Sequence, residues 1–258
     1  MYIDSHCHLN DTMLENDIES IILECKAKSV NTMIVVGFDY ESSLKAIEIA
    51  KRFPNTCRAA VGIHPSEVSK INIDSECKKI EGIINAPEVI AVGEIGLDYH
   101  YGVEDKEEQI ELLKKQIVLS NKYSKPIIFH VRDAFGDFMN IINNITINKK
   151  GVIHCFSGSK EIALELTNKG FYLGVGGVLT FKNSKEIKNV ILNMDKTKLL
   201  FETDSPYLAP EPHRGQVNKP YNVIYVYEKA QEILNIPSSE LQSMIENNFK
   251  KAFNYGKD

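Results

Sequence analysis

The 258-residue sequence lacks paired cysteines, an export signal and any long apolar run. Its five cysteines lie far apart and form no C-x-x-C motif, which argues against a structural zinc or dithiol redox site of that type. We therefore expect reduced thiols in a reducing compartment. Because no basic segment followed by an apolar one precedes Asp4, and no apolar run approaches about 18 residues, we expect a cytoplasmic protein without a membrane segment.

The sequence also lacks an excess of positive charge. Its 30 lysines and arginines against 35 aspartates and glutamates give a formal net charge of −5. Such a chain is poorly suited to coat a long nucleic acid through lysine and arginine contacts. A polyanionic substrate would have to be attracted locally, and bound divalent cations supply a local field of this kind.

No low-complexity linker or long Gly, Ser or Pro tract divides the chain. Its hydrophobic fraction of 43% and charged fraction of 25% are typical of soluble globular domains. Barrels of alternating strands and helices reach this length as one unit. We therefore expect a single domain over residues 1–258.

Short β-rich segments recur along the chain, and most are separated by amphipathic stretches such as residues 105–123. Several are apolar on both faces, as expected for parallel strands buried between a barrel interior and outer helices. Eight such units predict an α/β protein with a single-domain (β/α)8 TIM barrel, and an open doubly wound sheet is the alternative. Residues 222–253 are expected to form two helices of the outer ring. The predicted strands cover residues 2–8, 32–38, 58–64, 89–97, 126–132, 152–156, 172–178 and 199–203.

The clearest chemical signal is His6-Cys7-His8 at the end of the first predicted strand. A strand has a period of two, so both imidazoles point to one face while Cys7 points to the other. Both rings can then reach one metal ion. An HxH pair alone is equally compatible with an ordinary polar strand end, so the assignment depends on its neighbours.

Four further polar residues stand where predicted apolar strands end: Glu94, His130, His154 and Asp204. Burying such a group without a partner costs on the order of a few kcal/mol, so the same placement in several strands indicates a common partner. A shared metal centre is the simplest one. The predicted metal ligands are His6, His8, Glu94, His130, His154 and Asp204.

Four histidines and two carboxylates exceed the ligand set of one tetrahedral zinc ion. A carboxylate can bridge two ions, which favours two cations about 3.5 to 4 Å apart, the separation found in two-metal phosphatases and nucleases. Histidine and carboxylate ligands accept zinc, manganese and, with carboxylate support, magnesium. We therefore expect two divalent ions, which can be Mg²⁺, Mn²⁺ or Zn²⁺.

Six segments together resemble the signature blocks of TatD-family metal-dependent deoxyribonucleases, which belong to a wider metal-dependent hydrolase superfamily. They occur in that family's order and cover nearly the whole chain. The resemblance implies a TIM-barrel fold and 3′ to 5′ exonuclease chemistry on DNA. The segments are Asp4-Ser5-His6-Cys7-His8-Leu9, Gly62-Ile63-His64-Pro65, Gly93-Glu94-Ile95-Gly96-Leu97-Asp98-Tyr99, His130-Val131-Arg132-Asp133-Ala134, His154-Cys155-Phe156-Ser157-Gly158 and Glu202-Thr203-Asp204-Ser205-Pro206-Tyr207-Leu208.

Carried over residue by residue, the resemblance implies one ion held by His6, His8 and Asp204. It places the other ion at His130 and His154, with Glu94 bound to both ions. These six residues are the same as those assigned from the strand ends.

Three residues are predicted to act in catalysis: Glu94, Asp204 and His64. Metal ions lower the pKa of bound water toward neutrality and polarise phosphate oxygens. Glu94 would hold both ions, and Asp204, beside that water, would take its proton and pass it toward the leaving oxygen. His64 ends another predicted strand and is not needed as a ligand. We assign it to the scissile phosphate as a hydrogen-bond donor or general acid, with core packing as the alternative.

Two arginines are candidates for holding a phosphate through a bidentate fork: Arg132, at a strand end, and Arg214, in a turn-rich segment after the last strand. Ion pairs with neighbouring acids are the alternative for both. For Tyr207 we expect core packing ahead of stacking on a nucleobase. Positions 216 and 217 carry Gln and Val where similar sequences often carry basic residues, which favours short or single-stranded DNA ends over long duplex.

Two other functions are compatible with these residues. The same scaffold and a metal-activated water also serve amide or ester hydrolases that act on small-molecule or aminoacyl substrates. No strand-end lysine suited to carbamylation as a metal bridge is present, and Glu94 would take that place. A non-catalytic metal-binding protein would lack an open coordination position or a general base, and this sequence retains both. The sequence does not distinguish DNA from RNA as the substrate, since no contact to a 2′-hydroxyl can be predicted from it.

Overall fold

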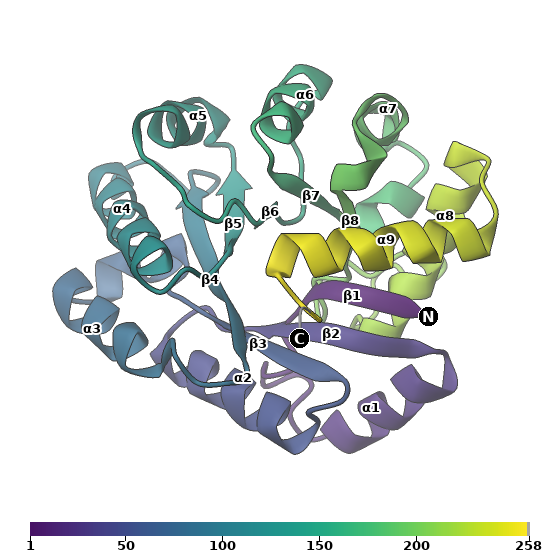
Figure 1. Ribbon diagram of the computed structural model, residues 1–258, viewed down its shortest axis with the longest axis horizontal. Helices are drawn as coiled ribbons and strands as arrows, with labels where there is room; N and C mark the ends of the chain where they lie inside the picture. Colours follow the sequence, from purple (N-terminus) through teal and green to yellow (C-terminus); the bar gives the residue numbers. More distant parts are fainter. Residues whose placement is uncertain (257–258) are drawn as a thin grey trace.

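The computed structural model describes residues 1–256, in which eight parallel strands alternate with helices (Figure 1). The strands hydrogen-bond in chain order from β1 to β8, and the predicted (β/α)8 barrel is confirmed. The last two residues of the predicted domain, 257–258, lie outside the described part. The strands are β1 Tyr2–Cys7, β2 Val30–Val36, β3 Cys57–Val61, β4 Val89–Asp98, β5 Ile127–Arg132, β6 Val152–Ile153, β7 Tyr172–Val175 and β8 Leu199–Phe201.

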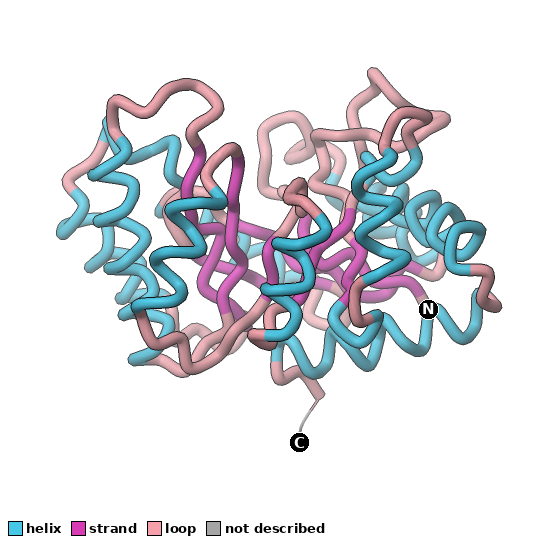
Figure 2. Tube along the Cα trace, turned by 90° about the horizontal axis from the view of Figure 1, so that it is seen from above, coloured by secondary structure: helices cyan, strands magenta, loops and turns pink. Residues whose placement is uncertain are grey.

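The helices form a ring outside the strands (Figure 1), and Figure 2 shows the strands lying between helices from a second direction. The predicted pair of C-terminal helices is confirmed, and the second of them, α9, packs against β1 and β8. The α-helices are α1 Ile18–Ala27, α2 Tyr40–Arg52, α3 Ile73–Ile83, α4 Lys106–Lys122, α5 Phe135–Asn144, α6 Lys160–Asn168, α7 Lys185–Asn193, α8 Val223–Leu234 and α9 Ser238–Phe253. Short 3-10 helices span η1 Pro65–Lys70, η2 Gly177–Thr180, η3 Lys196–Lys198 and η4 Pro220–Asn222.

The strands are buried on both faces, as their apolar composition predicts. Met33, Ile34, Val35 and Val36 in β2 are all fully buried, and the same holds for most residues of β4. Side chains of one strand therefore alternate between the barrel interior and the layer beneath the helices. This arrangement leaves the strand ends and their loops to carry polar residues.

The barrel closes where β1 meets the end of β8. The backbone N–H of His8 donates to the carbonyl of Ser205 at 2.7 Å, and that of Asp204 donates to the carbonyl of His6 at 3.0 Å. The buried carboxylate of Asp4 accepts from the backbone N–H and the hydroxyl of Thr203, at 2.9 and 2.6 Å. These bonds hold the first and last strands together, so the open-sheet alternative is wrong.

The loop between β2 and α2 is short and fixed by a capping box. The Asp39 side chain accepts from the backbone N–H of Ser42 at 2.7 Å, and the Ser42 hydroxyl accepts from the backbone N–H of Asp39. The preceding residue, Phe38, is thereby held at the carboxyl end of the barrel.

In residues 1–256 no helix has both the length and the apolar character needed to cross a membrane.

Candidate metal centre

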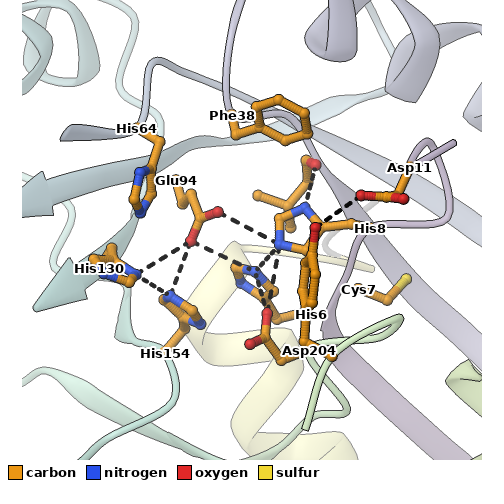
Figure 3. Close-up of polar contacts among 12 residues, drawn as sticks. His6, Cys7, His8, Asp11, Phe38, His64, Glu94, His130, His154 and Asp204 are labelled. Atoms are coloured by element: carbon orange, nitrogen blue, oxygen red, sulfur yellow. Dashed lines mark hydrogen bonds and ion pairs between the residues drawn. The ribbon is translucent and has the colours of Figure 1, made fainter. Parts of the chain in front are cut away.

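The structure brings all six predicted metal ligands together at the carboxyl ends of the strands, where barrel enzymes carry their active sites (Figure 3). His6 lies in β1, Glu94 in β4 and His130 in β5. The other three follow directly after strands or within three residues of one. We call these six side chains the metal centre: His6, His8, Glu94, His130, His154 and Asp204.

One half of the metal centre consists of His6, His8 and Asp204. The Nε2 atoms of the two imidazoles lie 3.1 Å apart, because alternate residues of β1 point to the same side. Oδ1 of Asp204 lies 3.6 Å from Nε2 of His6 and 3.4 Å from Nε2 of His8. Asp204 has a φ of 55°, a left-handed conformation that aspartate tolerates better than most residues.

The other half consists of His130 and His154, whose Nδ1 and Nε2 atoms lie 3.0 Å apart. Glu94 stands between the two halves, as Figure 3 shows. Its Oε2 lies 2.9 Å from Nε2 of His154 and 3.7 Å from Nδ1 of His130, and its Oε1 lies 3.4 Å from Nε2 of His8. One carboxylate therefore faces ligand atoms of both halves.

The donor set fits divalent cations. Two imidazole nitrogens face each other at about 3 Å in each half, and a pair of nitrogen lone pairs at that distance repels unless a proton or a cation lies between them. Oε2 of Glu94 is buried, and the nitrogens that face it belong to His6, His130 and His154, at 3.7, 3.7 and 2.9 Å. Imidazole nitrogens and carboxylate oxygens are ligands of zinc, manganese and magnesium sites.

Groups outside the metal centre orient two of the imidazoles. The Nδ1 of His8 lies 3.0 Å from the carbonyl oxygen of Val36, to which it can only donate, so Nε2 is the nitrogen that faces the centre. The Nε2 of His130 lies 3.1 Å from Oδ2 of Asp98, which turns Nδ1 inward. Asp98 was not among the predicted site residues. Its signal is its position in β4, four residues after Glu94 and hence on the same face of the strand.

The charges of the metal centre shift the pKa values of its members. Burial alone would raise the pKa of Glu94, but the adjacent His154 and the hydrogen bonds of His130 and His154 hold it well below its usual value. Burial alone would lower the pKa of His8, but its hydrogen bond with Asp204 and the charge of Glu94 raise it to about 9. With that pKa, His8 carries a proton at neutral pH.

His64 lies beside the second half of the metal centre, with its ring centre 4.3 Å from that of His130. Its Nδ1 accepts the backbone N–H of Ser66 at 3.1 Å, so the proton of the neutral ring is on Nε2. Burial and the neighbouring His130 lower its pKa to about 3. His64 is therefore a neutral hydrogen-bond donor at the edge of the centre.

The two predicted phosphate-binding arginines lie in different places. Arg132 lines the cavity above the metal centre, 5.5 Å from the ring centre of Tyr101, and forms no ion pair with any residue that the structure describes. The expected alternative partner, Asp133, pairs with His100 at 2.9 Å instead. Arg214 stacks on Phe181 at 4.4 Å and is not part of the cavity wall.

The cavity above the metal centre has a volume of about 640 Å³. Tyr207 forms part of its wall and is 48% exposed, so the prediction that it packs in the core is wrong. Its hydroxyl donates to Oδ2 of Asp11 at 2.9 Å, and its ring centre lies 6.1 Å from that of His8. The cavity is lined by His8, Phe38, His64, Ser66, Glu67, Glu94, Asp98, Tyr101, His130, Val131, Arg132, His154, Cys155, Ser157, Val178, Asp204, Tyr207 and Leu208.

The chain is similar to known proteins over nearly its whole length. The chain matches the family model of the TatD related DNases over residues 3–254. The uncharacterized metal-dependent hydrolase YabD of Bacillus subtilis (strain 168) is 37% identical over 254 residues, which cover 98% of this chain and 99% of that protein. The uncharacterized metal-dependent hydrolase YcfH of Escherichia coli (strain K12) is 31% identical over 255 residues, covering 97% of this chain and 95% of YcfH.

The crystal structure of YJJV, a TatD homolog from Escherichia coli K12, has the same fold. It matches this structure with a TM-score of 0.93 at 29% sequence identity, and the match covers 98% of both chains. The resemblance predicted from the six sequence segments is thus confirmed. The chain belongs to the family of TatD related DNases and is a metal-dependent hydrolase.

Proposed function

We propose that this protein removes nucleotides from the 3′ ends of single-stranded DNA by hydrolysing phosphodiester bonds, with two divalent cations bound at the metal centre. The observation that carries the proposal is the position of Glu94 at the floor of an open cavity. Its two oxygens face imidazoles of opposite halves, at 3.4 Å from His8 and 2.9 Å from His154. A bridging carboxylate beneath an accessible cavity is the arrangement of two-metal hydrolases of phosphate esters.

The proposed ligands divide as the two halves do. His6, His8 and Asp204 would hold one Mg²⁺, Mn²⁺ or Zn²⁺ ion, His130 and His154 the other, and Glu94 both. When bound, the cations supply the Lewis acidity that acidifies a water molecule and polarises the oxygens of the phosphate. Orientation and proton transfer then depend on the side chains of the protein.

Asp204 is the proposed general base. Its carboxylate lies on the cavity side of His6 and His8, with 14% of the side chain exposed, so solvent from the cavity reaches it. Placed there, it takes the proton of the attacking water and returns it toward the oxygen that leaves phosphorus. The water oxygen forms the new bond to phosphorus as the bond to the leaving oxygen breaks.

His64 is the proposed donor to the scissile phosphate. Because Ser66 holds Nδ1 as an acceptor, the Nε2–H of the neutral ring is available for a phosphate oxygen or for the leaving oxygen. Its pKa of about 3 makes the imidazolium form scarce at neutral pH, so hydrogen bonding is favoured over full proton donation.

The side chains that line the cavity are suited to bind a nucleotide. Arg132 has no competing ion pair with a described residue and presents a free guanidinium for one phosphate. Phe38, Tyr101 and Tyr207 offer ring surfaces on which nucleobases stack regardless of sequence. Arg132 is the only lysine or arginine among the lining residues, which suits a strand end better than a long duplex. Arg214 lies outside the cavity, so it would contact only the part of the DNA strand that extends beyond the cavity.

We further propose that the protein acts in the cytoplasm as one domain spanning residues 1–258. The support for this location is that all five cysteines are free in the structure, and four of them are buried. A reducing compartment keeps such thiols unpaired. The support for one domain is the continuous eight-stranded barrel that the described residues form.

The test is a hydrolysis assay with Mg²⁺, Mn²⁺ and Zn²⁺ on DNA oligonucleotides labelled at the 5′ end. The proposal expects a ladder of products shortened from the 3′ end, faster on single strands than on duplex, and lost in Glu94→Ala. A single-stranded oligonucleotide of RNA with the same sequence measures the preference for the sugar. Internal cleavage of circular single-stranded DNA would contradict the exonuclease mode.

The alternative is an amide or ester hydrolase of small-molecule or aminoacyl substrates. The same metal centre would act on a carbonyl carbon, since the chemistry of the activated water is shared. A panel of aminoacyl esters, amides and phosphodiesters therefore belongs in the same assay. Turnover of carbonyl substrates with none of the phosphodiesters would overturn the DNA assignment and leave the hydrolase assignment intact.

A further inference from the structure

Glu202 is a fully buried carboxylate beside the metal centre and is not one of the proposed ligands. It follows β8 directly. Its Oε1 accepts a hydrogen bond of 2.6 Å from the backbone N–H of Cys155 and lies 3.5 Å from Nδ1 of His154. Its Oε2 is buried and has no hydrogen-bond partner in residues 1–256. Burying an unpaired carboxylate oxygen is costly. The position of Glu202 therefore indicates that it accepts a hydrogen bond from a nearby donor in the functional state.

Two imidazoles of the metal centre stack on each other close to Glu202. The ring centres of His6 and His154 lie 4.0 Å apart with 9° between the ring planes, although the two residues belong to different halves. Their Nε2 atoms face Glu94, at 3.7 and 2.9 Å. When Nε2 is the ligand atom of a neutral imidazole, the proton is on Nδ1. Each ring then presents an N–H donor away from the ions.

These two donors are buried and poorly paired. Nδ1 of His6 has no hydrogen-bond partner in the part of the chain that the structure describes, and Nδ1 of His154 has the long contact to Glu202. One atom each of His6, His154 and Glu202 lie within 4.8 Å of one another. Such a trio also resembles a ligand set for a cation, but two N–H donors repel a cation whereas a carboxylate accepts them.

We propose that Glu202 is a positioning residue that accepts the Nδ1–H groups of both His6 and His154 and thereby couples the two ion sites. The proposal rests on the two-ion centre of the proposed function. The bond to His154 would form by shortening the present 3.5 Å contact of its Nδ1 with Oε1, and the bond to His6 by a small ring movement or through one bridging water. Loss of this acceptor leaves both rings free to turn, so the affinity for both ions falls.

Gly174 in β7 makes room for the carboxylate. A Cβ atom built on Gly174 would collide with Oε2 of Glu202, so the absence of a side chain at position 174 allows the carboxylate to lie where it does. Asp98 provides the matched comparison. It accepts from a single imidazole, the Nε2 of His130 at 3.1 Å, and therefore supports one half of the metal centre only.

The test is a calorimetric titration of the metal-free full chain with Mn²⁺, comparing wild type, Glu202→Gln and Asp98→Asn. Glu202→Gln keeps the side-chain volume and an oxygen for the backbone N–H of Cys155, but it removes the negative charge that both Nδ1–H groups would face and replaces one acceptor oxygen with an NH₂ group. We expect it to weaken both binding steps by about 10- to 100-fold, whereas Asp98→Asn weakens one step. A wild type that binds fewer than two Mn²⁺ ions would overturn the two-ion centre, and the titration reads this without any assay of hydrolysis.

Melting temperatures in EDTA separate positioning from a structural role. We expect metal-free Glu202→Gln to melt within about 4 °C of metal-free wild type, because the interaction with the rings matters when ions are bound. Should that variant not fold, Gly174→Ala displaces the carboxylate while keeping its charge, and the same loss in both steps is expected. Unchanged affinity in both steps, a loss confined to one step, or a larger drop in the metal-free melting temperature would overturn the proposal.

Discussion

Nε2 of His8 and Oδ1 of Asp204 face each other at 3.4 Å across the first half of the metal centre. Although burial disfavours the charged ring, this carboxylate and Glu94 raise the pKa of His8 to about 9. A metal ion needs the neutral ring, so binding must displace that proton. Metal affinity and pH are therefore linked through this pair.

We predict that Mn²⁺ binding strengthens as the pH rises from about 6.5 to 9. Below about 9 His8 carries a proton that the ion displaces, so the apparent affinity falls by about tenfold per pH unit for each proton released. Titrations in two buffers of different ionisation enthalpy measure the protons released. An affinity independent of pH over this range would contradict the assignment of His8 as a ligand.

The same raised pKa predicts how the metal-free protein responds to pH. The folded-state pKa of His8 lies above its unfolded value of about 6.5, so its stabilisation is complete below pH 6.5 and is lost as the pH rises through about 9. The melting temperature in EDTA should therefore fall between these pH values. Saturating Mn²⁺ should reverse that trend, because ions bind the folded state more tightly at higher pH.

Replacing Glu94 should remove both ions together. Glu94→Gln takes away the charge that faces both halves, so we predict loss of both Mn²⁺ binding steps and at least about a thousandfold loss of hydrolysis. Glu67→Gln is the matched control, since Glu67 lines the cavity and pairs with Lys70 at 3.0 Å. Retention of one tightly bound ion in Glu94→Gln would contradict the bridging role.

His64 should affect turnover without affecting metal binding. We predict that His64→Ala lowers kcat by about a hundredfold to ten-thousandfold, because its Nε2–H no longer stabilises charge on the phosphate or the leaving oxygen. The Mn²⁺ isotherm should stay within about twofold of wild type, since His8, His130 and Asp204 are unchanged. A parallel loss of metal and activity would make His64 a ligand instead.

Replacing Arg132 should raise KM for DNA much more than replacing Arg214. Arg132→Ala is predicted to raise KM for DNA by about tenfold or more, because it removes the cavity's guanidinium. Arg214→Ala, on a residue stacked against Phe181 outside the cavity, should change KM by less than about threefold. Steady-state kinetics on a short single strand distinguish the two. Equal increases in KM for the two variants would contradict this prediction and would mean that the DNA strand passes over Phe181.

Tyr207 should contribute to DNA binding through its ring and not through its hydroxyl. Stacking of one base is worth about 1–3 kcal/mol, so Tyr207→Ala should raise KM by about 5- to 150-fold, and Tyr207→Phe should stay close to wild type. An oligonucleotide with an abasic 3′ end is the control, because it offers no base to stack. If Tyr207→Ala lowers activity on the abasic end equally, the ring serves another purpose.

The fold and the metal centre were accessible to sequence reasoning for one physical reason. Strands buried on both faces must be apolar, so a histidine or carboxylate at a strand end is conspicuous. Parallel strands also end at one mouth of a barrel, which turns separate strand ends such as Glu94 and His130 into neighbours. The convergence of the six predicted ligands at one end of the barrel follows from these two facts.

Other features depend on side-chain geometry that a pattern does not contain. Asp98 and Glu202 lie in recognisable segments, but only the structure reveals that each carboxylate lies beside an imidazole. Tyr207 follows an apolar strand, yet the turn after Asp204 directs its ring into the cavity instead of the core. Arg214 was predicted from its loop, and its stacking on Phe181 is a contact between distant segments.

The most direct test of the two-ion centre is anomalous diffraction from crystals of the protein grown with Mn²⁺. Two peaks are predicted about 3.5 to 4 Å apart, each within bonding distance of a Glu94 oxygen, one beside His6 and His8 and the other beside His130 and His154. A single peak, or peaks that do not touch Glu94, would contradict the account.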